Sequence, residues 1–412
     1  MKLKAVMELC PKKMMKMPDV EEFHDIEEAR MVTELLAWDD LTGMQLDRGK
    51  VKEARMKEME YVHKKEVWVK IPRSQAIANS WKIIKIRWID INKGDDENPI
   101  YRSRAVGKEF NDGAIAGLFA GTPPLEALRA LVSEAATIGG EEKIIMINDV
   151  ARAFFEAKAT RKVCIELQDE DKTPDDIRKD NVGLLQMNFY GTRDAATNWQ
   201  EEVAKEMISW GFTRGKYNPC LYFHQATGLK TLVHGDDFVS VGSRAAMSTF
   251  RKQLEKRFEI KTKVVGTGAG EDSEGKVLNR IIRVTEDGWE YEPDQRHAEI
   301  IIDELGLHDA KPATTPGEDE NRSEEEQNEV PLRSDMASRF RSIATRINYL
   351  AADRPDIMYS AKEACRQMAN PTEGVWQMVK RIGRYLVGRP RAVLKYEWQS
   401  RESPCMGFSD SD

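Results

Sequence analysis

Two adjacent carboxylates, Asp236 and Asp237, lie within an otherwise apolar stretch of the sequence. The apolar segment TLV precedes them and the apolar segment FVSV follows them. Gly235 allows the chain to reverse direction between these two segments. Adjacent carboxylates repel one another, and partial burial disfavours their charged forms further, so a bound divalent cation commonly stabilises such a pair. An ordinary hairpin turn fits the same pattern, and the local sequence leaves both interpretations open.

A third carboxylate, Asp149, follows the apolar run from Ile144 to Ile147, which predicts a buried strand. Asp149 is either the N-cap of a helix or a ligand on a strand beside Asp236 and Asp237. In the second case, three carboxylates would hold two Mg²⁺ ions about 3.5–4 Å apart, the arrangement of phosphoryl-transfer polymerases. Carboxylate oxygens without His or Cys favour Mg²⁺ over zinc.

The elements that must position these carboxylates follow from the spacing of apolar residues. The predicted helices are 121–137, 193–212 and 243–258, and the predicted strands are 143–150, 220–225, 229–242, 258–265, 276–284 and 289–293. This order predicts an α+β fold in which helices cover one face of a sheet. Beyond Asp294 the pattern is mainly helical, and the polar stretch Gln168–Asp180 is predicted to be a loop.

Composition excludes several classes of protein. The chain has no apolar run near the roughly 18 residues that span a membrane and no recognisable secretory signal. Its five scattered cysteines indicate a reducing, intracellular setting. The net charge of −7 at first argues against nucleic-acid binding. That average conceals an acidic linker at 317–329 and a basic segment, Leu332–Val393, with twelve Lys or Arg against five Asp or Glu.

Six motifs, taken in order, resemble those of the reverse transcriptases of copia-type long-terminal-repeat retrotransposons. The resemblance extends from about Lys52 to Asp412. The motifs are RWIDINKG (87–94) with YRSRAVGKEF (101–110), DVARAF (149–154), YGTRDAATNW (190–199), HGDD (234–237), NYLAADRPDI (348–357) and RIGRYLVGRPR (381–391). Each motif alone is weak, and their common order carries the resemblance.

The resemblance implies a right-hand polymerase fold with fingers, palm and thumb, an antiparallel palm sheet packed on helices, and a mainly helical C-terminal part. Its expected parts are an N-terminal helical extension at 1–65, fingers at 66–140, a palm with an inserted fingers segment at 141–293, a thumb and connection at 294–400 that includes the acidic linker 317–329, and the start of a truncated RNase H domain at 401–412.

The resemblance also implies roles for particular residues. Asp149, Asp236 and Asp237 would be catalytic and would bind two Mg²⁺ ions, with Mn²⁺ as a possible substitute. One ion would lower the pKa of the primer 3′-hydroxyl, and the other would neutralise the triphosphate and the leaving pyrophosphate. Phe154 would pack under the nucleotide sugar and exclude a ribose 2′-hydroxyl. The expected nucleotide-binding residues are Arg102, Arg104, Lys108, Arg152, Ala153, Phe154, Tyr190 and Gly191.

Other basic and aromatic residues have two interpretations each. Basic residues on the fingers strand either grip phosphates or belong to a solvated strand face. Trp81 and Trp88 either stack on template bases or belong to the core. Four C-terminal arginines either follow the backbone of a duplex or lie on a solvated helix face. These four are Arg381, Arg384, Arg389 and Arg391.

Several residues depart from the family pattern. His234 and Gly235 replace Tyr and Val before the paired aspartates, and Thr192 and Asp194 replace Leu and Gln in the Tyr-Gly block. We expect Asp194 to add negative charge near the nucleotide and to impair turnover. Asp410, in GFSDSD, would be the first metal ligand of an RNase H domain whose other ligands are missing.

Two functions from different classes remain open. One is an RNA-directed DNA polymerase that uses an RNA template, a DNA primer and dNTPs, with other parts of a Pol polyprotein as further partners. The other is a catalytically silent retrotransposon remnant or a domesticated nucleic-acid-binding protein. An unrelated two-metal nuclease would leave the ordered fingers and thumb motifs unexplained. We expect an intracellular location, cytoplasmic in a virus-like particle or nuclear, without membrane association.

Overall fold

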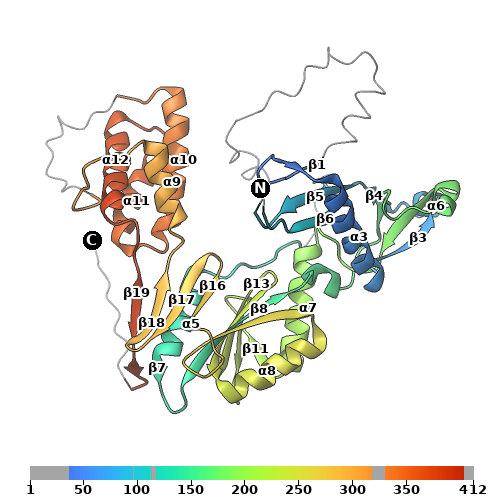
Figure 1. Ribbon diagram of the computed structural model, residues 1–412, viewed down its shortest axis with the longest axis horizontal. Helices are drawn as coiled ribbons and strands as arrows, with labels where there is room; N and C mark the ends of the chain where they lie inside the picture. The colour runs from blue at the N-terminus through green and yellow to red at the C-terminus, as the bar shows by residue number, and fades with distance from the viewer. Residues whose placement is uncertain (1–36, 96, 112, 114–116, 318–329, 403–412) are drawn as a thin grey trace. The chain divides into compact units, whose positions relative to one another are not determined.

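The computed structural model describes residues 37–95, 97–111, 113, 117–317 and 330–402 (Figure 1). Residues 1–36 of the predicted N-terminal extension, residues 318–329 of the acidic linker and Asp410 lie outside the described residues. The chain divides into two compact units, Met1–Leu118 with Phe154–Trp199 and Phe119–Ala153 with Gln200–Asp412. Among the described residues, no helix is long and apolar enough to cross a membrane.

The first unit combines short sheets with one long helix, α3 (Arg48–Lys64), which begins where the Asp47 side chain accepts a hydrogen bond from the N–H of Lys50. Strand β4 pairs in parallel with β9, and the other strands of the unit pair antiparallel. The sheets are β1–β2 (Ala37–Trp38, Gln45–Leu46), β3–β10–β9–β4 (Trp68–Pro72, Asn181–Leu185, Val163–Glu166, Lys82–Ile84) and β5–β6 (Ile86–Asn92, Tyr101–Gly107). Short helices α4 (Arg73–Ala78), α6 (Pro174–Lys179) and η2 (Ala153–Glu156) complete the elements.

The core of the first unit forms where α3 meets two aromatic residues from distant segments. Met59 and Val62 of α3 are almost fully buried. The rings of Phe155 and Phe189 stack with centroids 6.0 Å apart in the same cluster. This packing brings η2, which contains Phe155, and the segment before Tyr190 against the same core.

The polar stretch Gln168–Asp180 is more than the loop that its composition predicts, because it contains α6. The hydroxyl of Thr173 accepts a hydrogen bond from the N–H of Asp176, and the Asp176 carboxylate accepts one from the N–H of Thr173. Burial alone would raise the pKa of Asp176, but hydrogen bonds from Asn181 and Lys70 outweigh it and hold the pKa well below its usual range.

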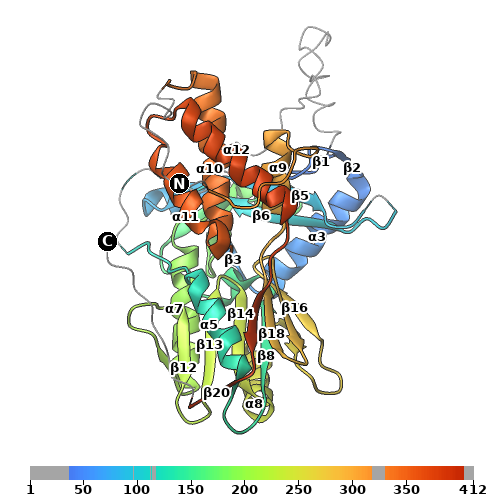
Figure 2. The ribbon, with the colours of Figure 1, turned by 90° about the vertical axis from the view of Figure 1, so that its left-hand side faces the viewer.

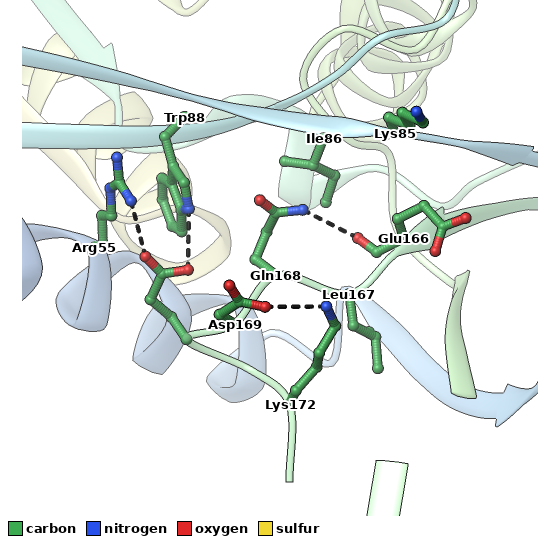
Figure 3. Close-up of a pocket in the computed structure, with 10 residues that line it drawn as sticks. Arg55, Lys85, Ile86, Trp88, Glu166, Leu167, Gln168, Asp169 and Lys172 are labelled. Atoms are coloured by element: carbon green, nitrogen blue, oxygen red, sulfur yellow. Dashed lines mark hydrogen bonds and ion pairs between the residues drawn. The ribbon is translucent and has the colours of Figure 1, made fainter. Parts of the chain in front are cut away.

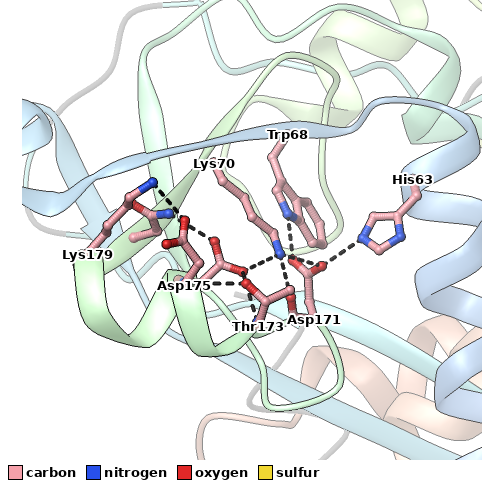
Figure 4. A network of polar contacts seen from close by, with 9 residues as sticks. His63, Trp68, Lys70, Asp171, Thr173, Asp175 and Lys179 are labelled. Carbon is pink, nitrogen blue, oxygen red and sulfur yellow. Dashed lines mark hydrogen bonds and ion pairs between the residues drawn. The ribbon is translucent and has the colours of Figure 1, made fainter.

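A second carboxylate fixes the same stretch to the rest of the first unit (Figure 4). The side chain of Asp171 is fully enclosed and lies 2.7 Å from His63 of α3 and 3.2 Å from Lys70 of β3. It also accepts a hydrogen bond of 3.0 Å from the indole N–H of Trp68. Hydropathy did not reveal this network because the Asp171 carboxylate is buried among hydrogen-bond donors rather than solvated.

A six-stranded antiparallel sheet in the second unit carries the three candidate carboxylates. Its strand order is β11–β12–β13–β14–β8–β15. The strands are β11 (Phe212–Arg214), β12 (Leu221–His224), β13 (Leu229–His234), β14 (Asp237–Ser243), β8 (Lys143–Val150) and β15 (Ile260–Val265). The strand predicted at 143–150 is therefore confirmed, and it lies between its two neighbours β14 and β15.

Helices cover both faces of this sheet, so the prediction of helices on one face was wrong (Figure 1). On one face, Ile145 and Val241 pack with α5 (Leu125–Ala136). On the other face, Phe250 of α8 (Arg244–Arg257) contacts Phe212 with ring centroids 5.0 Å apart. Strand β8 carries buried apolar side chains on both of its faces. Each face of the sheet must therefore be covered by helices. Helix α7 (Ala195–Ser209) begins in the first unit and continues into the second.

A four-stranded antiparallel sheet follows, in the order β16–β17–β18–β19. The segment 276–284, predicted as one strand, instead turns at Leu278 and Asn279, whose φ values of 47° and 65° are both left-handed. A two-residue turn with positive φ at both positions matches the twist of a hairpin. The strands are β16 (Glu274–Val277), β17 (Arg280–Thr285), β18 (Gly288–Glu292) and β19 (Leu394–Glu397). The short strands β7 (Thr137–Ile138) and β20 (Gln399–Ser400) pair in parallel.

The C-terminal part of the second unit is helical, as predicted (Figure 2). Its helices share one apolar core that includes Phe340, Ile347, Val379 and Leu386. The helices are α9 (Arg296–Leu305), α10 (Ser334–Ala351), α11 (Pro355–Arg366) and α12 (Glu373–Gly388).

Two charged residues of the motif NYLAADRPDI, Asp353 and Arg354, are buried, and Asp353 contacts the four-stranded sheet. Asp353 accepts hydrogen bonds from Arg280 at 3.0 and 2.7 Å and from the Tyr291 hydroxyl at 2.6 Å. Arg354, 1% exposed, makes a two-bond pair with Asp356 at 2.9 and 2.7 Å. Sequence reasoning assigned no role to this motif, and the structure makes it a junction between sheet and helices.

Candidate active site

A tight hairpin presents Asp236 and Asp237 at the end of the six-stranded sheet. His234 pairs with Asp237, so Gly235 and Asp236 form a two-residue loop. Gly235 has a φ of 63°, and a β-carbon placed there would meet nothing within 4 Å. A glycine with positive φ at the first loop position is the arrangement of a type II′ turn. Gly235, a departure from the family pattern, thus supplies the backbone conformation that this turn requires.

Strand pairing brings Asp149 directly opposite Asp237. The two residues are partners in the register of β8 and β14. The N–H of Val150 donates to the carbonyl of Asp236 at 3.0 Å, which makes Asp149 and Asp237 a non-hydrogen-bonded pair. In such pairs the Cα atoms lie about 4.5 Å apart and both side chains point to the same face. The backbone therefore holds two of the three candidate carboxylates side by side.

The three carboxylates act on one another electrostatically. The pKa of Asp237 is raised to about 6, chiefly by burial and further by the negative charges of Asp236 and Asp149. Asp237 is half-buried, whereas Asp149 and Asp236 are exposed. Oxygen donors with unbalanced negative charge suit a hard divalent cation. Within the part of the chain that the structure describes, however, no three His, Cys, Asp or Glu side chains are gathered closely enough to hold a metal ion.

Two further side chains share this row on the sheet. Lys261 of β15 is the register partner of Asp149 on the side away from β14. His234 is the register partner of Asp237 across the hairpin. Directly opposed residues in antiparallel strands point to the same face, so the row reads Lys261, Asp149, Asp237, His234. Sequence reasoning missed Lys261, although the alternation IKTKVV in its strand is a signal that could have found it.

Immediately after β8, the backbone enters a sparsely populated conformation. Arg152 has a φ of 51°, and it is a non-glycine residue in the left-handed region. Such a conformation costs about 1–2 kcal/mol. A role for the segment containing Arg152 and Ala153 in directing backbone N–H groups to a triphosphate stays a prediction. Phe154 follows at the boundary between the two units.

In the first unit, the structure brings together several residues expected to bind nucleotide. The rings of Phe154 and Tyr190 lie 5.1 Å apart. The Arg104 guanidinium lies 4.8 Å above the Tyr190 ring and also pairs with buried Glu58 at 3.3 Å. Arg104 is thus held by internal contacts in the protein without nucleotide. A role in gripping phosphates stays a prediction.

The two remaining basic candidates lie along and just beyond the same strand. Arg102 pairs with Ile91 across β5 and β6 and is half-buried. Lys108 follows β6, is exposed, and donates its backbone N–H to the carbonyl of Lys85 at 2.7 Å. Arg102 and Arg104 are two residues apart on the strand and therefore point to one face.

Gly191 allows the Tyr190 turn to approach β6 closely. Gly191 has a φ of 82°, and a β-carbon there would lie 2.1 Å from the carbonyl oxygen of Gly107. The N–H of Gly107 donates to the carbonyl of Tyr190 at 2.7 Å. Only a glycine fits between these two backbone segments without displacing one of them.

We expect Gly191→Ala to lower the free energy of unfolding by about 2–4 kcal/mol, because positive φ and overpacking both disfavour alanine. Urea unfolding measures the change. Gly43→Ala is the matched control, since Gly43 has a φ of 69° but nothing within 4 Å of its β-carbon position. Its loss should be about 1–2 kcal/mol. Equal losses in the two variants would contradict the close approach.

Asp194 does not stand as an isolated negative charge. Its carboxylate lies 2.5 Å from the guanidinium of Arg161. Burial alone would raise the pKa of Asp194, but the hydrogen bond and the charge of Arg161 outweigh it and lower the pKa. The negative charge that we expected near the nucleotide is therefore paired inside the first unit.

The four C-terminal arginines make contacts within the second unit. Arg381 donates to the Gly317 carbonyl at 3.0 Å, and Arg384 donates to the Lys311 carbonyl at 3.2 Å. Arg391 pairs with Glu292 at 2.5 and 2.9 Å. The Arg389 guanidinium lies 5.7 Å above the Tyr385 ring. Neither of the two interpretations of these arginines, a solvated helix face or a duplex-binding surface, predicted such internal contacts. Duplex binding stays a prediction.

A polar cavity of about 350 Å³ lies in the first unit, between β5 and the segment 166–172 (Figure 3). The indole N–H of Trp88 donates to Glu170 at 3.1 Å. The Arg55 guanidinium lies 5.2 Å above the Trp88 ring. Trp88 is thus fixed by neighbours in the wall of this cavity, while Trp81 packs beside a small apolar cluster around Cys164.

Comparison with known families identifies the segment that carries these residues. Residues 68–269 match the family described as reverse transcriptase (RNA-dependent DNA polymerase). The match includes Asp149, Asp236 and Asp237, together with every residue expected to bind nucleotide. The chain contains a reverse transcriptase domain. The family resemblance expected from the ordered motifs is therefore confirmed.

Curated proteins similar to this chain include Pol polyproteins from plant transposons. The chain is 22% identical over 382 residues to the retrovirus-related Pol polyprotein from transposon TNT 1-94 of Nicotiana tabacum, covering 89% of this chain and 27% of that protein. It is 23% identical over 325 residues to the corresponding polyprotein from transposon RE2 of Arabidopsis thaliana, covering 75% of this chain and 20% of the relative. The chain thus spans between a fifth and about a quarter of these relatives.

Among solved structures, an apo telomerase from Candida tropicalis, truncated from its C-terminal domain, is similar at 10% identity. The TM-score is 0.35, and the similarity covers 60% of this chain and 62% of that chain.

Proposed function

We propose that this chain is the RNA-directed DNA polymerase of a copia-type retrotransposon, extending a DNA primer on an RNA template. The observation that carries the proposal is the pairing of Asp149 with Asp237 across β8 and β14, next to Asp236, inside the matched domain. Burial, together with the negative charges of Asp236 and Asp149, raises the pKa of Asp237, and this unbalanced charge supports a divalent cation as a ligand of the site.

In this proposal, Asp149, Asp236 and Asp237 would hold divalent cations, with Mg²⁺ favoured and Mn²⁺ as a substitute. Bound Mg²⁺ would acidify a primer 3′-hydroxyl and neutralise charge on the triphosphate. Among the described side chains, no three potential ligands lie close enough together to form a closed ligand set. The exposed Asp149 and Asp236 would therefore have to reorient on binding.

The chain's own residues would select and orient the nucleotide. The Phe154 ring, supported by Tyr190, would pack under the sugar and exclude a 2′-hydroxyl. The backbone around Arg152 would direct N–H groups to the triphosphate. Arg102 and Arg104 of β6, and Lys108 just after it, would face the phosphates. Regions 66–140, 141–293 and 294–400 would then serve as fingers, palm and thumb.

The test is Mg²⁺-dependent dNTP incorporation on an RNA template with a DNA primer. The wild-type chain should extend the primer, and Asp149→Asn should not. Asp175→Asn is the matched control, since Asp175 belongs to another Asp-Asp pair and is held by Arg178 and Lys179 on the surface of α6. Equal incorporation by the wild type and Asp149→Asn would exclude the proposal.

The same assay separates the alternative function, a silent element remnant or nucleic-acid-binding protein. The absence of a closed metal-ligand set among the described residues favours that alternative. A protein that binds RNA–DNA duplex equally well with and without Asp149→Asn, and that incorporates no dNTP, would be such a remnant.

A further inference from the structure

One side chain, Arg161, fastens together three segments that carry the expected nucleotide-binding residues. It lies between η2, which contains Phe154, and β9. Its guanidinium binds the Glu109 carboxylate through two parallel hydrogen bonds of 2.8 and 2.9 Å. It also binds Asp194 at 2.5 Å. All of these residues belong to the first unit.

The two carboxylates lie next to the ends of the other two segments. Glu109 stands two residues after Gly107, the last residue of β6, and Asp194 stands three residues after Gly191. Glu109 also accepts a hydrogen bond of 2.8 Å from the backbone N–H of Arg193. Since Gly107 itself donates to the Tyr190 carbonyl, the strand end and the turn are tied at two places.

Burial makes these contacts strong. The Glu109 side chain is fully enclosed, and that of Asp194 is 11% exposed. For both carboxylates burial alone would raise the pKa, but the hydrogen bonds from Arg161 lower it. Lys82, at 3.6 Å from Glu109, supplies the second positive charge. Two enclosed carboxylates are thus matched by two cations, and removing Arg161 would leave the carboxylates under-compensated.

We propose that Arg161 is a positioning residue that holds β6, the Phe154 segment and the Tyr190–Gly191 turn in the geometry that binds the incoming dNTP. Asp194, where the family has Gln, is then a structural acceptor for Arg161 and not an inactivating charge. The link to dNTP binding rests on the proposed polymerase function. The structural role of Arg161 in joining the three segments is independent of that function.

Hydrogen exchange tests the fastening without any catalysis. In Arg161→Met, amides in 107–110 and 188–194 should exchange about tenfold faster than in the wild type, because their local opening loses an anchor. Amides of β8 should be unchanged. Arg161→Lys retains the charge but cannot form the two parallel bonds to Glu109, so an intermediate increase is expected. The lysine variant also provides the measurement if the methionine variant fails to fold.

Arg73→Met is the matched control. Arg73 likewise binds one carboxylate, Glu166, through two bonds of 2.7 Å and a second, Asp180, at 2.8 Å. Its side chain is 29% exposed, against 26% for Arg161. Wild-type exchange at 107–110 and 188–194 in Arg161→Met, or the same acceleration there in Arg73→Met, would overturn the proposal.

Steady-state kinetics tests the link to the nucleotide. Arg161→Met should raise KM for dNTP on the order of ten- to hundredfold with kcat largely retained, whereas Arg73→Met should change neither. A wild-type chain that incorporates no dNTP would refute the polymerase function alone, and exchange would still decide the fastening. An active wild type with unchanged KM in Arg161→Met would refute the positioning role.

Discussion

Asp237→Asn is expected to make the protein more stable at neutral pH while lowering dNTP incorporation on the order of 10³-fold or more. The loss of incorporation follows from the proposed role of Asp237 as a metal ligand, because such ligands contribute several kcal/mol of charge stabilisation to the transition state. The gain in stability follows from electrostatics of the metal-free protein. Burial and the charges of Asp236 and Asp149 disfavour the ionised Asp237 carboxylate.

The pH dependence has a definite sign. The pKa of Asp237 rises from 3.8 to about 6 in the folded protein. Between about pH 4 and 6 the folded state therefore binds more protons than the unfolded state, and the free energy of unfolding falls as pH rises. After discounting for solvent screening of this half-buried group, the full penalty at pH 7 is about 1–2 kcal/mol.

Urea unfolding in EDTA at pH 7 and pH 4 measures this effect. The advantage of Asp237→Asn should be present at pH 7 and absent at pH 4. Mg²⁺ should stabilise the wild type and leave the variant unchanged. Asp175→Asn, on the surface of α6, should differ from the wild type by no more than about 0.5 kcal/mol at either pH. If Asp237→Asn instead destabilises the protein at pH 7, the negative charges of the three carboxylates must already be compensated by other groups of the protein.

The second large effect concerns the buried pair of Arg280 and Asp353. We expect Asp353→Leu to lower the free energy of unfolding by about 3–5 kcal/mol, because it leaves a buried guanidinium without a carboxylate. The two side chains are only 4% and 3% exposed. Tyr291 loses its hydrogen-bond acceptor in the same variant.

A double variant distinguishes lost charge compensation from lost packing. Arg280→Met with Asp353→Leu removes both charges, and it should regain most of the stability that Asp353→Leu loses. Arg366→Met breaks an ion pair with Glu363 on the surface, in which the Arg366 side chain is 67% exposed and that of Glu363 21%. It should lower the free energy of unfolding by less than about 1 kcal/mol. Similar losses in Asp353→Leu and Arg366→Met would mean that the junction around Asp353 contributes little.

Local sequence patterns predicted the carboxylate-bearing strands well because their signals lie within a few residues. The apolar run of β8 and the glycine before Asp236 indicate a strand and a turn without knowledge of the rest of the fold. The register that sets Asp149 opposite Asp237 joins residues almost ninety positions apart, and no local pattern specifies it. A strand beside Asp236 and Asp237 was one of two interpretations that the sequence left open for Asp149, and the family resemblance favoured it.

Charged residues were the least predictable part of the structure. Composition made Gln168–Asp180 a loop, yet Asp171 and Asp176 are buried in a polar network. The sequence predicted no role for Arg161, and Asp194 was expected to impair turnover. Each of these side chains is explained by a partner from a distant segment, and hydropathy treats a paired buried charge and a solvated one alike. Long-range ion pairs can be identified only once the fold has brought the segments together.

The strand β19 has a consequence for how the chain folds. It completes the sheet β16–β17–β18 as the partner of β18, although it is synthesised about a hundred residues later. Until a ribosome has delivered Leu394–Glu397, β18 presents unpaired N–H and C=O groups along one edge, a surface on which other chains can pair. Such distant pairing is intrinsically slow to form. The nascent polypeptide is therefore open to such pairing while α9, α10, α11 and α12 are emerging, and a chaperone that shields this edge should act in that interval.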